Sequence, residues 1–118
     1  MKTVLVAEDN DSNYILMTYI LRGKYQVVRA SNGQEAIDAV AGGGIDLILM
    51  DMKMPVMDGL EATRRLKETN PSLPIIALTA NVFDSDRDAA LAAGCDDFLP
   101  KPVNSKHCLE TIAKFIDL

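Results

Sequence analysis

The sequence predicts an α/β protein with a parallel sheet covered by helices on both faces. Short aliphatic runs alternate with segments of helical periodicity, and this pair recurs five times along 118 residues. The runs are nearly continuous in apolar residues, as expected of strands that are buried on both faces of a parallel sheet. A chain of this length builds one core, so we expect a single domain over residues 1–118.

The order of the predicted elements follows the alternation of these two patterns. β-Branched and aliphatic residues mark the strands, and a spacing of three to four residues between apolar positions marks the helices. We expect strands at 3–7, 25–30, 46–51, 74–80 and 96–101, and helices at 11–22, 33–41, 59–70, 84–93 and 104–117.

The third predicted helix has clear boundary chemistry. Asp58 precedes "GLEATRRLKE" and can accept hydrogen bonds from the free N–H groups of the first turn. On the exposed face of the same helix, Glu61 with Arg65 and Arg64 with Glu68 are spaced for i,i+4 ion pairs.

Several residues that resemble functional groups are interpreted as structural. The glycines at 42–44 follow a helix and precede a strand, which is the reverse of the order in a phosphate-binding loop, so they indicate a helix stop. Cys95 and Cys108 lack a paired-cysteine motif and are expected to be small buried side chains or idle surface groups. His107 is expected on the surface of the last helix rather than as a phosphodonor.

Charge and hydropathy exclude several classes of protein. The formal net charge is -5, and the lysines and arginines are scattered, which argues against a nucleic-acid interface. The start "MKTVLVAEDN" has only a short apolar stretch, and no later run approaches the length that spans a membrane. We therefore expect a cytoplasmic chain or domain without membrane contact, and the oligomeric state stays open.

Polar side chains gather where the predicted strands end. In an open parallel α/β sheet, ligand sites form beyond the carboxyl ends of the strands, so the residues at these positions are the candidates for function. They are Glu8 and Asp9 after the first strand, Asp51 at the end of the third, Thr79 and Ala80 at the end of the fourth, and Lys101 after the fifth.

Three carboxylates at one edge predict a metal-assisted phosphoryl site. Acids this close repel one another, so the cluster should either raise a carboxyl pKa or recruit a cation. Oxygen ligands without His or Cys favour magnesium. A carboxylate can attack phosphorus when cations and donors stabilise the developing charge, and Asp51 suits this role because an apolar strand fixes its position. Lys101 and the Thr79 hydroxyl can hold phosphoryl oxygens.

The motifs "VLVAEDN", "DLILMDMKMPVMDG", "PIIALTA" and "FLPKP", in this order and spacing, resemble the receiver domain of two-component response regulators. The resemblance extends over essentially the whole chain. It implies a flavodoxin-like (βα)5 fold whose five parallel strands lie in the order 2-1-3-4-5. The first and third strands would then be neighbours, with Glu8, Asp9 and Asp51 at the switch point of the sheet.

The resemblance also implies a role for each acid. Asp51 would accept a phosphoryl group from a phosphohistidine on a histidine kinase or a histidine phosphotransfer protein. Asp9 and Asp51 would bind magnesium directly, Glu8 would bind it through water, and the backbone carbonyl of Lys53 would complete the protein ligands. Manganese is an alternative ion. The partner is expected to dock on the first helix and on the loop that follows Lys101.

Further roles follow from the same family. Thr79, the backbone N–H of Ala80 and Lys101 would hold the phosphoryl oxygens, and Phe98 would be the switch aromatic that turns inward with Thr79. A cis bond is expected at Lys101–Pro102. Lys53 and Asn81, two residues after Asp51 and Thr79, lie where the family tunes dephosphorylation.

Other functions fit the sequence less well. "EDNDSN", "MPVMDGLEATR" and "ALTAN" are typical of receivers fused to sensor kinases, so we expect a hybrid-kinase origin, with a stand-alone regulator as the alternative. A haloacid-dehalogenase-like phosphatase needs a second acid where Lys53 stands. A flavin module would need a phosphate-binding first loop, and "AEDND" repels phosphate. The domain itself would catalyse only its own phosphorylation and dephosphorylation.

Overall fold

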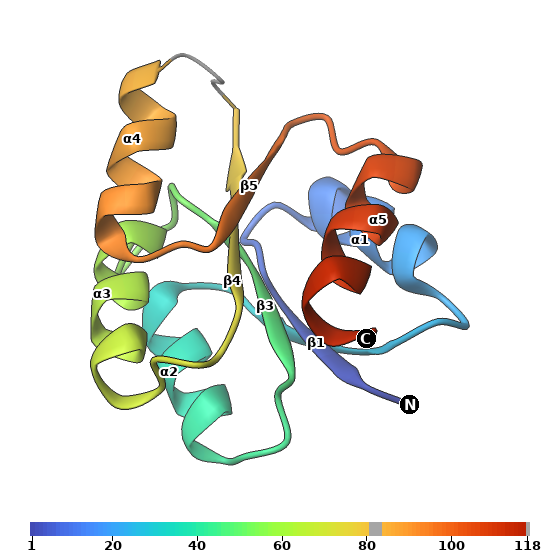
Figure 1. Ribbon diagram of the computed structural model, residues 1–118, viewed down its shortest axis with the longest axis horizontal. Coiled ribbons are helices and arrows are strands. Elements are labelled where there is room, and N and C mark those ends of the chain that lie inside the picture. The colour runs from blue at the N-terminus through green and yellow to red at the C-terminus, as the bar shows by residue number, and fades with distance from the viewer. Residues whose placement is uncertain (81–83, 118) are drawn as a thin grey trace.

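Five parallel strands form one sheet with helices on both faces (Figure 1). The structure is a computed structural model that describes residues 1–80 and 84–117, with the side chains of 84–86 left out. The strands are β1 (Thr3–Ala7), β2 (Gln26–Ala30), β3 (Leu47–Asp51), β4 (Ile75–Thr79) and β5 (Asp97–Pro100), in the order β2-β1-β3-β4-β5. The helices are α1 (Asp11–Leu21), α2 (Gly33–Ala41), α3 (Gly59–Thr69), α4 (Asp84–Ala93) and α5 (Ser105–Ile116).

The predicted fold class and strand order are confirmed, and each element boundary lies within one residue of its predicted position. Helices α1 and α5 cover one face of the sheet, and α2, α3 and α4 cover the other (Figure 1). The strands alternate between the two layers, because Val4 and Val6 of β1 pack on the α1–α5 side while Leu5 and Ala7 pack on the α2–α4 side. Both layers are apolar, so β1, β3 and β4 are continuous hydrophobic runs rather than alternating ones.

The register of the sheet aligns the carboxyl ends of the strands. Ala7 of β1 pairs with Met50 of β3, Asp51 pairs with Leu78 of β4, and Thr79 pairs with Pro100 of β5. All five residues of β3 are buried, which fixes the central strand on both faces. The residues that follow β1, β3, β4 and β5 therefore meet at one edge, which is the upper edge in Figure 1.

Helix caps agree with the sequence, but one ion pair does not. Asp58 caps α3 as predicted, because its Oδ1 accepts a hydrogen bond from the backbone N–H of Glu61 at 2.9 Å. Arg65 binds Glu61 at 3.0 Å as expected. The predicted Arg64–Glu68 pair is wrong, since Arg64 turns toward Glu61 at 3.5 Å instead. Glu61 lies one turn before Arg64 and Arg65 in α3 and forms ion pairs with both.

Two features of the loop between β3 and α3 fix its path. Gly59 passes so close to β3 that a Cβ atom built on it would lie 2.1 Å from the carbonyl oxygen of Asp51. Val56 adopts a φ of 66°, a left-handed conformation that is unfavourable for a β-branched side chain, and it is 85% exposed. The loop is therefore held tightly against the end of β3 and carries backbone strain at its tip.

The amino end of the sheet is closed by polar side chains. The Lys67 ammonium lies 2.8 Å from Asp96 and donates to the carbonyl of Leu73 at 2.7 Å, while the same Asp96 oxygen accepts from the N–H of Ile75 at 2.9 Å. The Tyr25 hydroxyl donates to the carboxylate of Asp117. These contacts tie α3, α5 and the strand starts together.

The residues interpreted as structural behave as predicted. Gly42 ends α2, and the next two glycines have positive φ angles of 84° and 87°. Cys95 and Cys108 are free and buried, and burial raises the pKa of each thiol to about 11. His107 is exposed on α5. No helix within the described ranges 1–80 and 84–117 has the length and apolar character needed to cross a bilayer.

Candidate functional site at the carboxyl edge of the sheet

The fold brings the three predicted acids together. Glu8 follows β1, Asp51 ends β3, and these two strands are neighbours in the sheet. One carboxylate oxygen from each of Glu8, Asp9 and Asp51 lies within 4.8 Å of the other two. Glu8 and Asp51 are buried, whereas Asp9 is exposed. Three negative charges thus share a small volume that is open to solvent at Asp9.

Lys101 is the counter-ion of this cluster. Its ammonium lies 2.8 Å from Glu8 and 3.2 Å from Asp51. Burial alone would lower the pKa of Lys101, but the hydrogen bond to Glu8 and the charges of Asp51 and Glu8 outweigh it, so the pKa of Lys101 is raised. Lys101 therefore stays charged and neutralises one of the three acids. The peptide bond from Lys101 to Pro102 is cis, as predicted.

Asp51 faces an open pocket of about 490 Å³. One of its oxygens accepts a hydrogen bond from the N–H of Lys53 at 3.2 Å, and the other faces Lys101. Glu8 lines a different and much smaller hollow, and both of its oxygens are engaged, one by Lys101 and one by the N–H of Asn10 at 3.2 Å. Of the two buried acids, Asp51 is the one that a ligand in the large pocket can reach.

The same pocket is lined by other residues predicted to bind the phosphoryl group or the metal. Thr79, Ala80, Lys53 and Lys101 line it together with Asp51. Thr79 is 5% exposed at the end of β4, so its position is set by the sheet. The prediction about Asn81 concerns a residue outside the described part of the chain.

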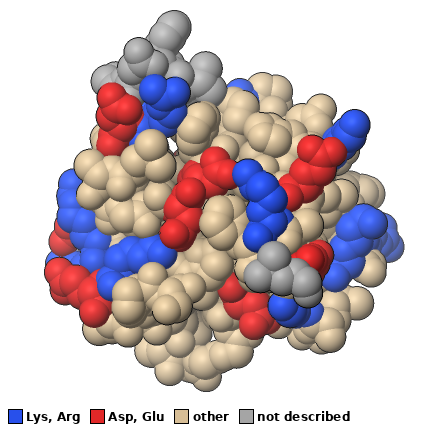
Figure 2. Space-filling view, viewed as in Figure 1, with Lys and Arg blue, Asp and Glu red and all other residues tan. Residues whose placement is uncertain are grey.

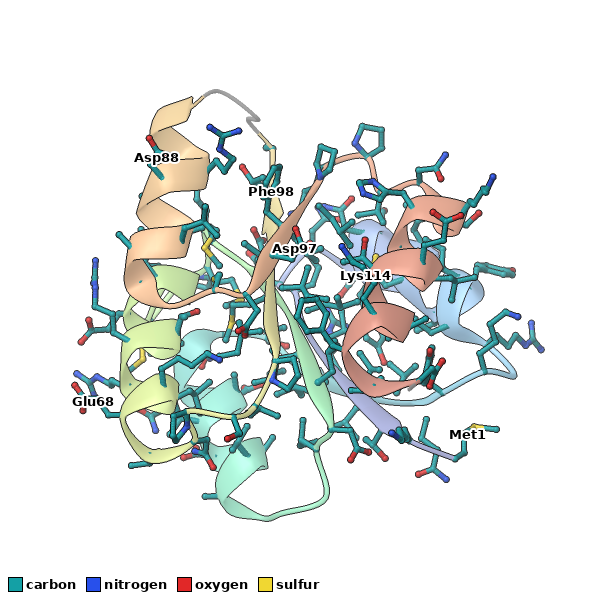
Figure 3. All side chains as sticks on the ribbon, in the orientation of Figure 1. Met1, Glu68, Asp88, Asp97, Phe98 and Lys114 are labelled. Atoms are coloured by element: carbon teal, nitrogen blue, oxygen red, sulfur yellow. The ribbon has the colours of Figure 1, made fainter. Side chains whose placement is uncertain are left out.

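Phe98 lies beside the pocket rather than in its lining. It is half-buried and packs against the core under α2, α3 and α4. The guanidinium of Arg87 from α4 lies 6.0 Å from the centre of its ring. Figure 3 shows Phe98 on the α4 side of the sheet, toward the edge that carries the acids. A rotation of this ring would therefore occur between the site and α4.

Sequence reasoning missed three contributors. Leu60 of α3 and Ala89 of α4 line the pocket and extend it between these helices. Arg29 of β2 contacts the loop that carries Glu8 and Asp9, through hydrogen bonds to the carbonyl of Glu8 at 3.2 and 3.3 Å. The signal for Arg29 was present, since a charged residue interrupts "YQVVRA", but an arginine on an edge strand usually points to solvent.

The donor set suits a hard divalent cation. Three carboxylates face one volume, and Lys101 supplies only one compensating charge. Carboxylate and carbonyl oxygens are the ligands that magnesium takes in proteins, and His or Cys ligands, which would favour zinc, are missing from this group of described residues. Glu8, Asp9 and Asp51 are therefore the residues that could hold such an ion, and Lys53, whose carbonyl is the fourth predicted ligand, lines the same pocket as Asp51.

Comparison with known protein families identifies the same domain. A profile described as the response regulator receiver domain matches residues 4–113. The two-component response regulator ORR41 of rice (Oryza sativa subsp. japonica) is 39% identical, and the alignment covers 98% of this chain and 94% of ORR41. The response regulator SSK1 of Arthrobotrys oligospora is 40% identical over 86% of this chain, which corresponds to only 12% of that protein.

Solved structures agree with the fold. The receiver domain of the sensor histidine kinase PA1611 from Pseudomonas aeruginosa PAO1 superposes with a TM-score of 0.92 at 34% identity, covering 99% of this chain and 98% of that one. That crystal structure has a magnesium ion in its active site cleft. The receiver domain of Saccharomyces cerevisiae Ssk1, crystallised with the phosphotransfer protein Ypd1, gives a TM-score of 0.91 at 34% identity over 97% of this chain and 88% of that one.

Proposed function

This chain belongs to the response regulator receiver domain family, and from that premise we propose that Asp51 accepts a phosphoryl group in the presence of magnesium. The chain is thus a receiver domain of two-component signal transduction, over residues 1–118. The donor is a phosphohistidine on a histidine kinase or on a histidine phosphotransfer protein. The observation that carries the proposal is that Asp51, buried and oriented at the end of β3, is the acid of this cluster that faces the large pocket.

The surroundings of Asp51 suit nucleophilic attack. The Lys53 N–H and the Lys101 ammonium each approach one of its oxygens at 3.2 Å, so the carboxylate has a fixed orientation. An oxygen of Asp51 forms the new bond to phosphorus while the phosphorus–nitrogen bond of the phosphohistidine breaks and its electron pair returns to the imidazole. The product is an aspartyl phosphate, an acyl phosphate of the kind that carboxylate nucleophiles form.

Neighbouring residues would hold the transferred group. Lys101 is charged and already close to Asp51, so it can bind one phosphoryl oxygen. The Thr79 hydroxyl and the Ala80 N–H line the same pocket and can bind others. Movement of Thr79 toward the phosphoryl group would leave room for Phe98 to turn inward, and this is the conformational switch that we propose.

Magnesium would be held by Asp9, Asp51 and the carbonyl of Lys53, with Glu8 contributing through water. When bound, the ion neutralises charge on the acids and on the phosphoryl oxygens. Lys101 compensates only one of the three carboxylates, which supports a requirement for an added cation. Manganese has the same preference for oxygen ligands and is proposed as a substitute.

Phosphorylation by a small donor tests the role of Asp51. With magnesium, a small acyl phosphate should label the protein on one residue, and D51N should remove the label. D58N is the matched control, because Asp58 also lines the pocket but its amide would still cap α3 and label formation should persist. Labelling of D51N, or labelling of the wild type without a divalent ion, would contradict the proposal.

The partner surface is proposed on α1. Ile15, Leu16 and Tyr19 are 53%, 39% and 69% exposed there, and large apolar side chains exposed on one helix favour a protein partner. A small hollow between α1 and the loop after Lys101 lies next to Glu8. Receiver partners of the helical-bundle type could approach the site over this surface.

A comparison of a protein donor with a small-molecule donor distinguishes a defect in partner docking from a defect in phosphoryl transfer. Y19A should slow transfer from such a partner by about tenfold, while labelling by a small acyl phosphate stays unchanged. K24A, exposed beyond the end of α1, is the control for a general surface change. Equal loss with both donors would place the defect in the site and would contradict a docking role for Tyr19.

The parent protein and location are further proposals. Relatives of both kinds are found, since PA1611 is a sensor histidine kinase and ORR41 has nearly the length of this chain. We propose a hybrid-kinase origin, with a stand-alone regulator as the alternative. The flanking sequence of the gene distinguishes the two. For either origin we propose a cytoplasmic location. Acidic and basic side chains are interspersed on the face in Figure 2, which supports the expectation that nucleic acid is not a partner.

A further inference from the structure

Arg29 reaches from β2 under the loop between β1 and α1, which carries two of the three acids. Its Nε and Nη2 atoms donate to the carbonyl oxygen of Glu8 at 3.3 and 3.2 Å, and Nη2 also approaches the carbonyl oxygen of Asp9 at 3.4 Å. The same nitrogen binds Oδ1 of Asp11 at 2.8 Å. The guanidinium stacks on the Tyr14 ring, 4.5 Å from its centre.

We propose that Arg29 is a positioning residue for the divalent cation. It holds the backbone of residues 8–11 so that the carboxylates of Glu8 and Asp9 face Asp51 before the ion arrives. The inference rests on the proposed magnesium site and adds a residue outside it that controls its affinity. Arg29 belongs to β2, which contributes no ligand to that site.

Asp9 is the acid that most needs such support. It is exposed, and no hydrogen bond or ion pair to any described side chain fixes its carboxylate. Its charge is repelled by Glu8 and Asp51, which would turn it away from the cluster in the absence of a cation. The position of Asp9 is therefore set by its backbone, and Arg29 holds that backbone from below at two successive carbonyls.

Geometry rather than charge should dominate the effect of Arg29. A positive charge near a cation site weakens the binding of a cation, so an unpaired arginine would oppose magnesium. Here the guanidinium is paired with Asp11 at 2.8 Å, and this pair is close to neutral as seen from the site. The main effect of Arg29 on the site is then the set of hydrogen bonds from its guanidinium to the carbonyls of Glu8 and Asp9, which fix the loop. A lysine has one ammonium and cannot both bridge these carbonyls and stack on Tyr14.

Magnesium titration of Arg29 variants tests the proposal. Amide chemical shifts of the loop report binding directly, without any phosphoryl transfer. R29A should weaken magnesium affinity by about tenfold, as is typical when a residue supporting metal ligands is lost. R29K keeps the charge and should recover little of the loss. R22A is the matched control, since Arg22 is exposed beyond the end of α1 and should leave the affinity unchanged.

Two further measurements separate positioning from a general structural role. At saturating magnesium, the rate of labelling of R29A by a small acyl phosphate should return to within about twofold of wild type, because Lys101 and Thr79 are untouched. Without magnesium, the backbone amides of residues 8–10 should exchange faster in R29A than in wild type. If R29A is poorly folded, R29M keeps the apolar stem against Tyr14 and carries the same expectation.

The outcomes are distinguishable. Unchanged magnesium affinity in folded R29A, full recovery in R29K, or an equal loss in R22A would overturn the role of Arg29 and leave the proposed function intact. A wild-type protein that does not bind magnesium, or is not labelled on Asp51, would overturn the proposed function itself. Tighter magnesium binding in R29A would show that charge outweighs geometry and would also overturn the inference.

Discussion

The two ends of the sheet use lysine in opposite ways. At the amino end, Lys67 meets one acid, Asp96, at 2.8 Å and fills its other donor positions with the carbonyls of Leu73 and Pro71 at 2.7 and 3.4 Å. At the carboxyl end, Lys101 is the ammonium placed among three acids, and it contacts two of them. The first cluster is neutral and its donors are satisfied, whereas the second keeps an excess of negative charge.

The difference in charge balance indicates a structural role for the Lys67 cluster and a functional role for the Lys101 cluster. A balanced cluster with satisfied donors stabilises the fold and offers nothing to a ligand. An unbalanced cluster destabilises the folded chain through repulsion, yet it leaves a place for a cation and for a phosphoryl group. Removal of an acid should therefore have opposite effects on stability at the two ends, which the following variants test.

The largest effect is expected for D96A at the amino end. The substitution leaves the Lys67 ammonium, whose side chain is 16% exposed, without its counter-charge, and it removes the acceptor of the Ile75 N–H. Loss of the acceptor for the Lys67 ammonium and the Ile75 N–H should lower the free energy of unfolding, measured in urea, by about 2 kcal/mol. E68A, on the exposed side of α3 (Figure 3), should change it by no more than about 0.5 kcal/mol. Similar values for the two variants would contradict a structural role for this cluster.

Tyr25 should give a smaller effect that depends on pH. Burial, the hydrogen bond to Asp117 and the charge of that acid raise the pKa of Tyr25 to about 12. An unfolded chain loses the phenolic proton near pH 10, so this contribution to stability is complete below pH 10 and is lost as the pH rises toward 12.

Y25F should test both the size and the sign of this contribution. It removes the hydrogen bond to Asp117 and should lower the free energy of unfolding at neutral pH by about 1 kcal/mol. Between pH 10 and 12 the wild type should lose stability that Y25F does not lose, so the two curves converge. Melting temperatures across this range are the measurement, and a constant difference between the proteins would contradict the assignment.

The smallest effect, of opposite sign, is expected for D9N at the carboxyl end. Without magnesium, loss of one of three mutually repelling charges should raise the free energy of unfolding by about 0.5 kcal/mol. With magnesium the order should reverse, because the wild type gains binding energy and D9N binds the ion poorly. D88N, exposed on α4, should show no dependence on magnesium. Destabilisation of D9N without magnesium would contradict the comparison of the two ends.

The fold and the acid cluster could both be predicted from the same pattern in the sequence. The buried strands β1, β3 and β4 are continuous apolar runs that end at polar residues, and a parallel sheet places all strand ends together, so Glu8, Asp51 and Lys101 could be grouped without coordinates. Each helix and strand boundary was predicted to within one residue. These features depend on the spacing of apolar residues, which can be read from the sequence.

Other contacts could not be predicted because they depend on side-chain direction. Arg64 had two acids within reach on its helix, and the structure selects Glu61 over Glu68. Lys67 and Asp96 are 29 positions apart and share no pattern, since their contact exists only once α3 and the start of β5 are packed. The contact of Arg29 with the β1–α1 loop was not predicted for the same reason, because the sequence of β2 does not show which way this side chain points.

The distribution of the site over the strands has a consequence for how the domain can be studied. Glu8, Asp51, Thr79 and Lys101 follow or end four different strands, and they form one site only through the register of the whole sheet. An unfolded chain still contains Asp51 but has no place for the ion or the phosphoryl group, and a fragment that ends before β5 also lacks Lys101. If Asp51 accepts the phosphoryl group as proposed, the fraction of a preparation that becomes phosphorylated therefore counts the molecules that have reached the native topology.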